Sequence, residues 1–316
     1  MTNDILSVKD LKKTYPKNSI FSKEKPVTAL KGISFSAKQG EIFGILGPNG
    51  AGKSTAMNIL ADLLTSDSGS INIFGYDFFK NKEKIKENMS LINGYASYPT
   101  KLTVYENMKI YAKIYGVKDY NKRILELLEL VGIPEKKNKK FSELSSGQRT
   151  RVNIVKGLIH SPKLVLMDEP TIGLDPHIAL KIRKLIRKIS KVENTTIIFT
   201  SHNMQEVEEL CSRIALLKDG NILKTASPHE LTDLVDAQVY EIDYSGNSKI
   251  VKNIFSSFET LNISITKEKI KFEATRNFEL NDLLRSFVKN NINIVHINIK
   301  KPNLEHIFIE VAEGRL

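Results

Sequence analysis

Apolar runs and segments with helical spacing alternate through the middle of the chain. Residues 41–46 form a short apolar run that ends in a glycine-rich loop, and residues 54–64 follow with apolar positions at helical spacing. Residues 163–167 and 196–200 are two more apolar runs, with a helical pattern over residues 176–190 between them. This alternation predicts an α/β core with buried parallel strands.

Two other patterns flank this core. Residues 5–11 and 30–36 have the composition of strands on either side of a polar, lysine-rich loop at residues 16–26, which predicts an antiparallel start. Helical spacing over residues 104–115 and 122–131 predicts a helical subdomain.

The pattern changes past Asp236. Strand-like and helical segments follow in an order that predicts β, α, β, β, α, β, which is typical of a small ferredoxin-like module. We therefore expect two domains, residues 1–235 and residues 236–316. The C-terminal segments are strands at 238–244, 263–265, 270–273 and 296–299 and a helix at 280–289.

The composition limits the number of domains and the kinds of partner but does not by itself indicate a function. A chain of 316 residues with 41% hydrophobic residues can bury one large core and a smaller one. The net charge of +11 would suit nucleic acid or an anionic membrane, yet 26% charged residues of both signs is also an ordinary surface. The single cysteine, Cys211, predicts a buried thiol in a reducing, cytoplasmic compartment. No apolar run is long enough to span a bilayer, so a membrane role would depend on a partner.

The glycine-rich loop after the first core strand has the sequence GPNGAGKST. Its glycines let the backbone wrap phosphate groups with N–H bonds pointing inward, and the following helix adds its positive dipole end. Lys53 is expected to reach the β- and γ-phosphates and Ser54 to coordinate Mg²⁺. A chance glycine turn would not supply Lys-Ser between a strand and a helix. The expected ATP-binding residues are Gly47, Pro48, Asn49, Gly50, Ala51, Gly52, Lys53, Ser54 and Thr55.

Two carboxylates follow the apolar run LVLM. Ligands of α/β sheets bind at the carboxyl ends of the strands, which is where Asp168 and Glu169 lie. Asp168 is suited to hold Mg²⁺ through water, and Glu169 to orient or deprotonate the attacking water. A strand that ends in Asp-Glu is by itself more often a solvated turn, but the phosphate loop favours the catalytic interpretation.

Residues 4–235 resemble the nucleotide-binding subunit of ATP-binding cassette (ABC) transporters. The resemblance rests on four motifs in order: the phosphate loop, LSSGQR at 144–149, LMDEPTIGLDP at 166–176 and TSHNMQEVEEL at 200–210. It implies a P-loop NTPase fold with a RecA-like core, an antiparallel β subdomain and a helical signature subdomain. It also implies a head-to-tail dimer, in which the signature of one chain meets the ATP held by the other.

The resemblance assigns further roles. Ser145 also has a physical reason to bind an anion, because it is placed where a helix begins. Ser146 departs from the family's usual glycine, whereas Gly147 keeps the second one. The implied roles are the following: Ser145, Ser146, Gly147 and Gln148 cap the partner's ATP, His202 senses the γ-phosphate, Asp175 links the two ATP sites, and Tyr15 stacks on adenine.

One expected residue is missing. The family normally carries a glutamine between Ile92 and Leu102 that contacts Mg²⁺ and relays to the membrane subunit, but this stretch, INGYASYPTKL, has none. Asn93, a shorter carboxamide, is the candidate substitute. In the family the loop that includes Tyr98, Pro99 and Thr100 docks the transmembrane partner.

The sequences EPTIGLDP and KPNLEHIFIEV resemble the subunits that serve ABC-2-type exporters, and Leu304, Glu305 and Phe308 fit the pattern near their C-terminus. An amphipathic helix with Leu304, Ile307, Phe308 and Val311 on one stripe explains the same residues, and the chain can have both the exporter pattern and such a helix.

We expect a homodimer or pseudo-symmetric dimer that binds ATP and Mg²⁺ and drives export through a separate permease. Its place would be the cytoplasmic face of the membrane.

Two alternatives remain. A soluble relative that acts on ribosomes or DNA would also be basic, but the chain carries one cassette and no heptad insertion between Lys53 and Ser145, so nucleic acid is not the expected partner. An ATP-dependent scaffold without catalysis is disfavoured by the presence of Glu169 and His202.

Overall fold

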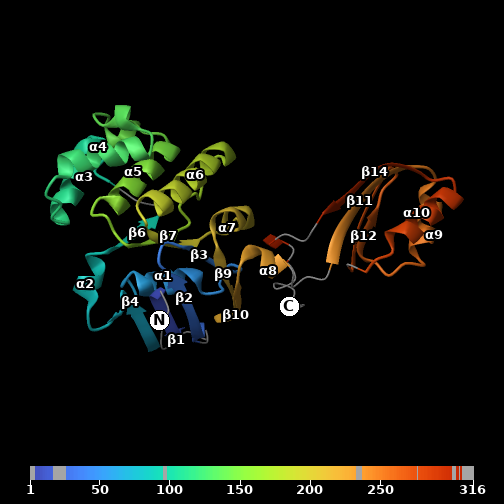
Figure 1. Ribbon diagram of the computed structural model, residues 1–316, viewed down its shortest axis with the longest axis horizontal. Coiled ribbons are helices and arrows are strands. Elements are labelled where there is room, and N and C mark those ends of the chain that lie inside the picture. The colour runs from blue at the N-terminus through green and yellow to red at the C-terminus, as the bar shows by residue number, and fades with distance from the viewer. Residues whose placement is uncertain are drawn as a thin grey trace, which may run out of the picture. The chain divides into compact units, whose positions relative to one another are not determined.

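The computed structural model describes residues 4–16, 26–94, 98–232, 237–275, 277–300, 304–305 and 307. The chain divides into two compact units, Met1–Pro228 and His229–Leu316. They are coloured blue to orange and orange to red in Figure 1. The expected domain boundary at 235/236 adjoins residues outside the described ranges, so it stays a prediction.

The centre of the first unit is a six-stranded sheet of order β10-β9-β3-β8-β7-β6. Neighbours from β6 to β9 are parallel, so their carboxyl ends meet at one edge of the sheet, and β10 is antiparallel to β9. The predicted parallel core is confirmed. The strands are β3 (Ile42–Leu46), β6 (Met89–Asn93), β7 (Leu164–Asp168), β8 (Thr196–Thr200), β9 (Arg213–Lys218) and β10 (Asn221–Ala226).

A second, antiparallel sheet of order β2-β1-β4-β5 packs against this core. Phe35 on β2 stacks on Phe43 of β3 with ring centroids 5.4 Å apart, which joins the two sheets through one apolar cluster. The antiparallel start is confirmed, whereas residues 17–25 of the expected loop lie outside the described residues. The strands are β1 (Asp4–Tyr15), β2 (Val27–Lys38), β4 (Ser68–Ile73) and β5 (Tyr76–Asp77).

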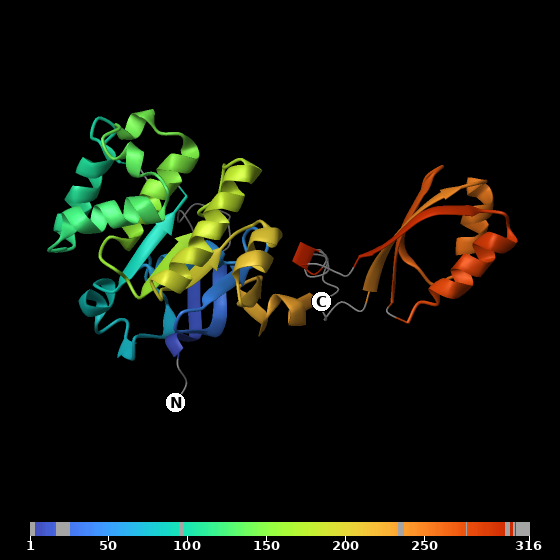
Figure 2. The ribbon, with the colours of Figure 1, turned by 45° about the horizontal axis from the view of Figure 1, so that its top comes forward.

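Helices α3, α4 and α5 form a separate subdomain, drawn in green beside β6 in Figures 1 and 2. Thr103 caps α3 through a capping box with Glu106, because T-x-x-E satisfies the free N–H groups of the first turn. The subdomain contains α3 (Val104–Ile114), α4 (Tyr120–Leu130), η1 (Pro134–Lys136), η2 (Phe141–Glu143) and α5 (Ser146–Leu158). The other helices of the first unit are α1 (Lys53–Leu60), α2 (Lys82–Lys86), α6 (Pro176–Val192) and α7 (Met204–Leu210), and α8 (Pro228–Thr232) crosses the boundary.

The helix expected over residues 54–64 ends early, at Leu60. Asp62 adopts a left-handed backbone with φ of 57°, which interrupts the helical hydrogen-bond ladder. Its carboxylate binds Lys82 and Lys86 at 2.6 Å each. Ala61 and Leu64, the last two apolar positions of the expected helix, are nevertheless partly buried against the main apolar cluster, so the apolar pattern continues beyond the end of the helix.

The second unit has the expected β, α, β, β, α, β order and is a ferredoxin-like sheet of order β12-β13-β11-β14, antiparallel throughout. Both helices cover one face, where Tyr240, Phe272 and Phe287 lie in a buried cluster. Leu304 and Ile307 are buried, whereas Phe308 and Val311 lie outside the described residues. The elements are β11 (Ala237–Ser245), α9 (Ser248–Phe255), β12 (Leu261–Ile265), β13 (Lys269–Thr275), α10 (Leu280–Lys289) and β14 (Asn293–Lys300).

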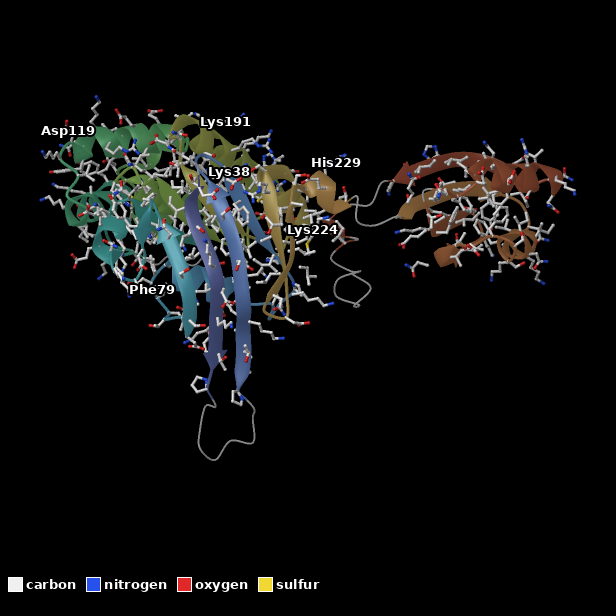
Figure 3. All side chains as sticks on the ribbon, turned by 60° about the horizontal axis from the view of Figure 1, so that its bottom comes forward. Lys38, Phe79, Asp119, Lys191, Lys224 and His229 are labelled. Carbon is white, nitrogen blue, oxygen red and sulfur yellow. The ribbon has the colours of Figure 1, made fainter. Side chains whose placement is uncertain are left out.

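Charged side chains of both signs lie on the surface of the first unit, as Figure 3 shows for Asp119, Lys191 and Lys224. Cys211 is buried as expected, and burial raises the pKa of its thiol, so it is an inert core residue. In the described part of the chain, no helix has the length and apolar character needed to cross a membrane.

Candidate active site

The glycine-rich loop leads from β3 into α1 with the backbone conformations that its glycines permit. Gly50 and Gly52 have φ of 82° and 109°. A Cβ atom on Gly47 would lie 2.2 Å from the Leu217 carbonyl oxygen, so only glycine fits there. No side chain caps the start of α1, which leaves its first N–H groups available to an anion.

Lys53 is folded back over this loop and is only 7% exposed. Its Nζ donates to the carbonyl oxygens of Gly47 at 2.7 Å and Pro48 at 3.1 Å. Burial lowers the pKa of the ammonium group, while the charges of Glu169 and Asp168 oppose that shift. A buried cation that is hydrogen-bonded only to neutral carbonyls among the described residues fits a polyphosphate ligand.

The two carboxylates lie at the adjacent end of β7. Asp168 accepts a hydrogen bond from the hydroxyl of Thr200 at the end of β8. Glu169 has a left-handed backbone with φ of 48°, and its N–H donates to the Thr200 carbonyl at 3.1 Å. Glu169 Oε2 lies 3.4 Å from His202 Nδ1, so the structure pairs the candidate base with the candidate γ-phosphate sensor.

A buried polar network supports the loops that carry Glu169 and His202. Glu206 on α7, which is 2% exposed, accepts from Thr171 Oγ1 at 2.6 Å, from Ser201 Oγ at 2.8 Å and from Arg183 Nη1 at 3.3 Å. Thr171 follows Glu169 by two residues and Ser201 precedes His202, so one carboxylate holds both loops. Sequence reasoning did not identify Arg183 or Glu206, although Glu206 lies inside the TSHNMQEVEEL motif.

Tyr15 lies beside the phosphate loop. Its hydroxyl is 3.3 Å from Thr55 Oγ1, and the side chain is partly exposed. This position, next to the loop but off its phosphate-facing backbone, is compatible with the expected contact to the base of the nucleotide.

The signature residues begin α5. Ser145 is the N-cap, and its hydroxyl accepts from the Gln148 N–H while Gln148 Oε1 accepts from the Ser145 N–H. A Cβ atom on Gly147 would lie 2.5 Å from Ile178 Cγ2, so a larger residue there would displace the Ile178 side chain. Ser146 is exposed, which explains why a serine is accommodated at the other glycine position.

Within one chain the described residues show no hydrogen bond or ion pair between the signature and the phosphate loop. Ser145 and Ser146 are exposed, and Asp175, just before α6, is exposed as well. The side chains of Ser145, Ser146 and Asp175 are therefore accessible from outside their own chain.

Asn93 ends β6 and is the register partner of Asp168 on β7. Its side chain is exposed, while its carbonyl oxygen accepts from Asn153 Nδ2 at 2.6 Å. The structure thus places the candidate substitute for the missing glutamine next to the proposed Mg²⁺ ligand, and among the described residues its side chain has no hydrogen-bond partner.

We predict that Asn93→Ala lowers ATP turnover about threefold to tenfold and raises the Mg²⁺ concentration needed for half-maximal activity, because it removes one oxygen ligand while keeping the backbone bond to Asn153. Turnover measured against Mg²⁺ concentration checks this. The exposed Asn221→Ala serves as a matched control and should behave as wild type. Unchanged turnover and Mg²⁺ dependence in Asn93→Ala would contradict a metal contact.

The residues fit a nucleoside triphosphate with Mg²⁺. The described part of the chain contains no group of three or more His, Cys, Asp or Glu side chains arranged to hold a metal ion alone. Ser54 and Asp168 would instead share Mg²⁺ with phosphate oxygens and water, which is the usual coordination of this ion. When bound, Mg²⁺ supplies charge neutralisation at the phosphates.

A phosphate loop between a parallel strand and a helix, with an adjacent carboxylate pair and a histidine, defines a P-loop ATPase. The chain belongs to the ABC transporter family. The family model described as ABC transporter matches residues 30–172. The linearmycin resistance ATP-binding protein LnrL of Bacillus subtilis is 34% identical over 98% of both chains. The Nod factor export ATP-binding protein I of Rhizobium etli is 31% identical over 96% of this chain and 92% of its own.

Solved structures agree with this assignment. The post-hydrolysis dimer of the ATP-binding cassette MJ0796, bound to ADP and Pi, superposes with a TM-score of 0.60 and 27% identity over 70% of this chain and 98% of that one. The chain is thus an ABC-type ATPase that binds a nucleotide, and cassettes of this fold dimerise.

Proposed function

We propose that two copies of this chain close around two ATP molecules and that hydrolysis reopens them to drive export through a separate membrane subunit. The observation that carries the proposal is the split site. The phosphate loop, Glu169 and His202 lie at one edge of the sheet, whereas Ser145 of the signature is exposed and, among the described residues, forms no hydrogen bond or ion pair with them. A site divided in this way needs a second copy.

In the proposed cycle each side chain has one task. Lys53 exchanges its two carbonyl partners for phosphate oxygens, and Ser145 and Gly147 of the second copy cover the γ-phosphate. Glu169 accepts the proton of the attacking water, and His202, held 3.4 Å from it, contacts the γ-phosphate. Loss of that phosphate removes the contact with the signature, so the two copies separate.

Export is favoured by the relatives. One is named for resistance to linearmycin and another for Nod factor export, and both align over nearly the whole chain. The place of action would be the cytoplasmic face of the membrane, through the permease. The interspersed surface charges give no support to nucleic acid as the partner.

The test is affinity purification of the chain from its native membranes, followed by reconstitution with the membrane protein that co-purifies. We expect the two proteins to co-purify in detergent and the ATPase rate in lipid vesicles to rise about threefold or more over the chain alone. The chain with ribosomes and the chain with DNA at moderate salt are the comparison samples. Stimulation by ribosomes or DNA but not by the membrane protein would overturn the proposal in favour of a soluble machine.

A further inference from the structure

Side chains near the end of α5 and just beyond it bind the outer edge of the six-stranded sheet. β6 is an edge strand, so its outward carbonyls have no strand partner and would otherwise need water or another donor. Three side chains at helical spacing reach alternate residues of this strand. The bonds are Asn153 Nδ2 to Asn93 O at 2.6 Å, Lys156 Nζ to Leu91 O at 3.3 Å, and His160 Nε2 to Met89 O at 3.1 Å.

The spacing of these three hydrogen bonds follows from the periodicity of the helix and that of the strand. Positions i, i+3 and i+7 share one face of a helix, and every second carbonyl of a strand points to the same side. Gly157 lets α5 pack closely on the side chain of Ile92, since a Cβ atom there would lie 2.4 Å from Ile92 Cδ1. The C-terminal half of the signature helix and the segment just after it are therefore bound to β6.

Asn153 differs from the other two because it makes a second bond. It is 4% exposed, and its Oδ1 accepts from the hydroxyl of Tyr98 at 3.0 Å. Tyr98 is equally buried, with its ring centroid 4.7 Å from that of Phe141. Burial raises the pKa of Tyr98, so its hydroxyl keeps the proton that it donates. One carboxamide thus holds Asn93 and Tyr98, which flank residues 95–97 outside the described ranges.

The Asn93 end of this connection touches the catalytic backbone. The Gly94 N–H donates to the Asp168 carbonyl at 3.2 Å, and a Cβ atom on Gly94 would lie 2.7 Å from the Glu169 carbonyl oxygen. At the other end, α5 runs about 12 Å, roughly two turns, from Asn153 back to its N-cap, the signature serine Ser145. Gly94, Ser146 and Asn153 all line one cavity of about 540 Å³.

We propose that Asn153, with Tyr98, is a positioning residue that transmits the position of the Asn93–Gly94 backbone to the signature helix. Through it, occupancy of a chain's own ATP site sets the position of the signature over the partner's ATP. This inference rests on the proposed dimer. This chain lacks the family's glutamine, and its connection between the ATP site and the signature helix runs through the Asn93 carbonyl and the buried carboxamide of Asn153.

The test separates nucleotide binding from dimer closure. Asn153→Leu removes both bonds with little change in volume, and the milder Tyr98→Phe removes one and keeps the ring. Tyr111→Phe is the matched control, because the Tyr111 ring packs edge-on at 5.7 Å from Tyr98 while its hydroxyl has no hydrogen bond among the described residues. All three are made in a Glu169→Gln background, in which we expect a closed dimer to persist with ATP.

We expect affinity for a fluorescent ATP analogue, measured on dilute monomer, to stay within about twofold in every variant. The dimer dissociation constant at saturating ATP, measured by analytical ultracentrifugation, should rise about tenfold in Asn153→Leu and about threefold in Tyr98→Phe, since a buried polar partner is lost. Tyr111→Phe should match the reference. A merely structural role would lower the unfolding temperature without changing the dimer constant well below it.

An unchanged dimer constant in both variants, or a parallel loss of ATP affinity, overturns the inference. If the Glu169→Gln reference itself stays monomeric with ATP, the proposed dimer fails and this inference fails with it. If the reference dimerises and the two variants match it, the proposed function stands and the role of Asn153 alone is refuted.

Discussion

Glu169→Gln should reduce ATP turnover by about 100-fold or more while leaving ATP affinity within about twofold of wild type. A glutamine keeps the size and the hydrogen-bonding oxygen that faces His202 at 3.4 Å, but it cannot accept the proton of the attacking water. Since the γ-phosphate then persists, the variant should accumulate as an ATP-bound dimer. Phosphate release measures the first effect, and analytical ultracentrifugation with ATP measures the second.

Glu208→Gln is the matched control for this variant. Glu208 lies on α7, a few residues from His202, and its side chain is exposed, so the same chemical change there should leave turnover and association as in wild type. If Glu169→Gln hydrolysed ATP at the wild-type rate, Glu169 would not be the general base.

Lys53→Ala should weaken ATP binding by about 100-fold or more, because it removes the one buried cation of the phosphate loop among the described residues and the charge-assisted hydrogen bonds it offers to phosphate. Calorimetric titration with Mg²⁺-ATP measures the affinity directly. An independent readout is thermal unfolding, since a ligand that binds only the folded state raises the unfolding temperature. Excess ATP should stabilise the wild type and leave Lys53→Ala unchanged.

Lys184→Ala, an exposed lysine on α6, controls for the loss of a positive charge in the same unit and should bind ATP normally. The unfolding temperature without nucleotide shows that Lys53→Ala is folded, although the loop loses the two bonds to Gly47 and Pro48. Wild-type ATP affinity in Lys53→Ala would refute the assignment of this lysine to the phosphates.

The sequence predicted some helices and strands of the first unit correctly, missed one strand and made one helix too long. β3, β7 and β8 were found because buried parallel strands are continuous apolar runs with clear ends. β6 was missed, since five residues on a sheet edge, MSLIN, carry no distinctive periodicity. The helix after the phosphate loop was predicted too long because apolar spacing continued past Asp62, where the left-handed backbone stops it.

The residues of the candidate site likewise divide into those that the sequence predicted and those that it did not. Lys53, Ser54, Asp168 and Glu169 were assigned from contiguous residues, whose roles depend on local backbone shape. Glu206 and Arg183 were not, because α6 and α7 are rich in charged residues and nothing in their order marks which of them is buried. Their pairing appears only when the two helices pack.

By itself, the sequence determined the chemistry of this protein: a phosphate loop, a carboxylate pair and a signature, each encoded in a short continuous segment whose backbone geometry is local. The tertiary structure decided which distant groups meet. Asn153 binds the carbonyl of Asn93, 60 residues away, and Glu206 gathers Thr171, Ser201 and Arg183. Such contacts depend on how helices pack against sheet edges, and burial then makes each hydrogen bond costly to lose.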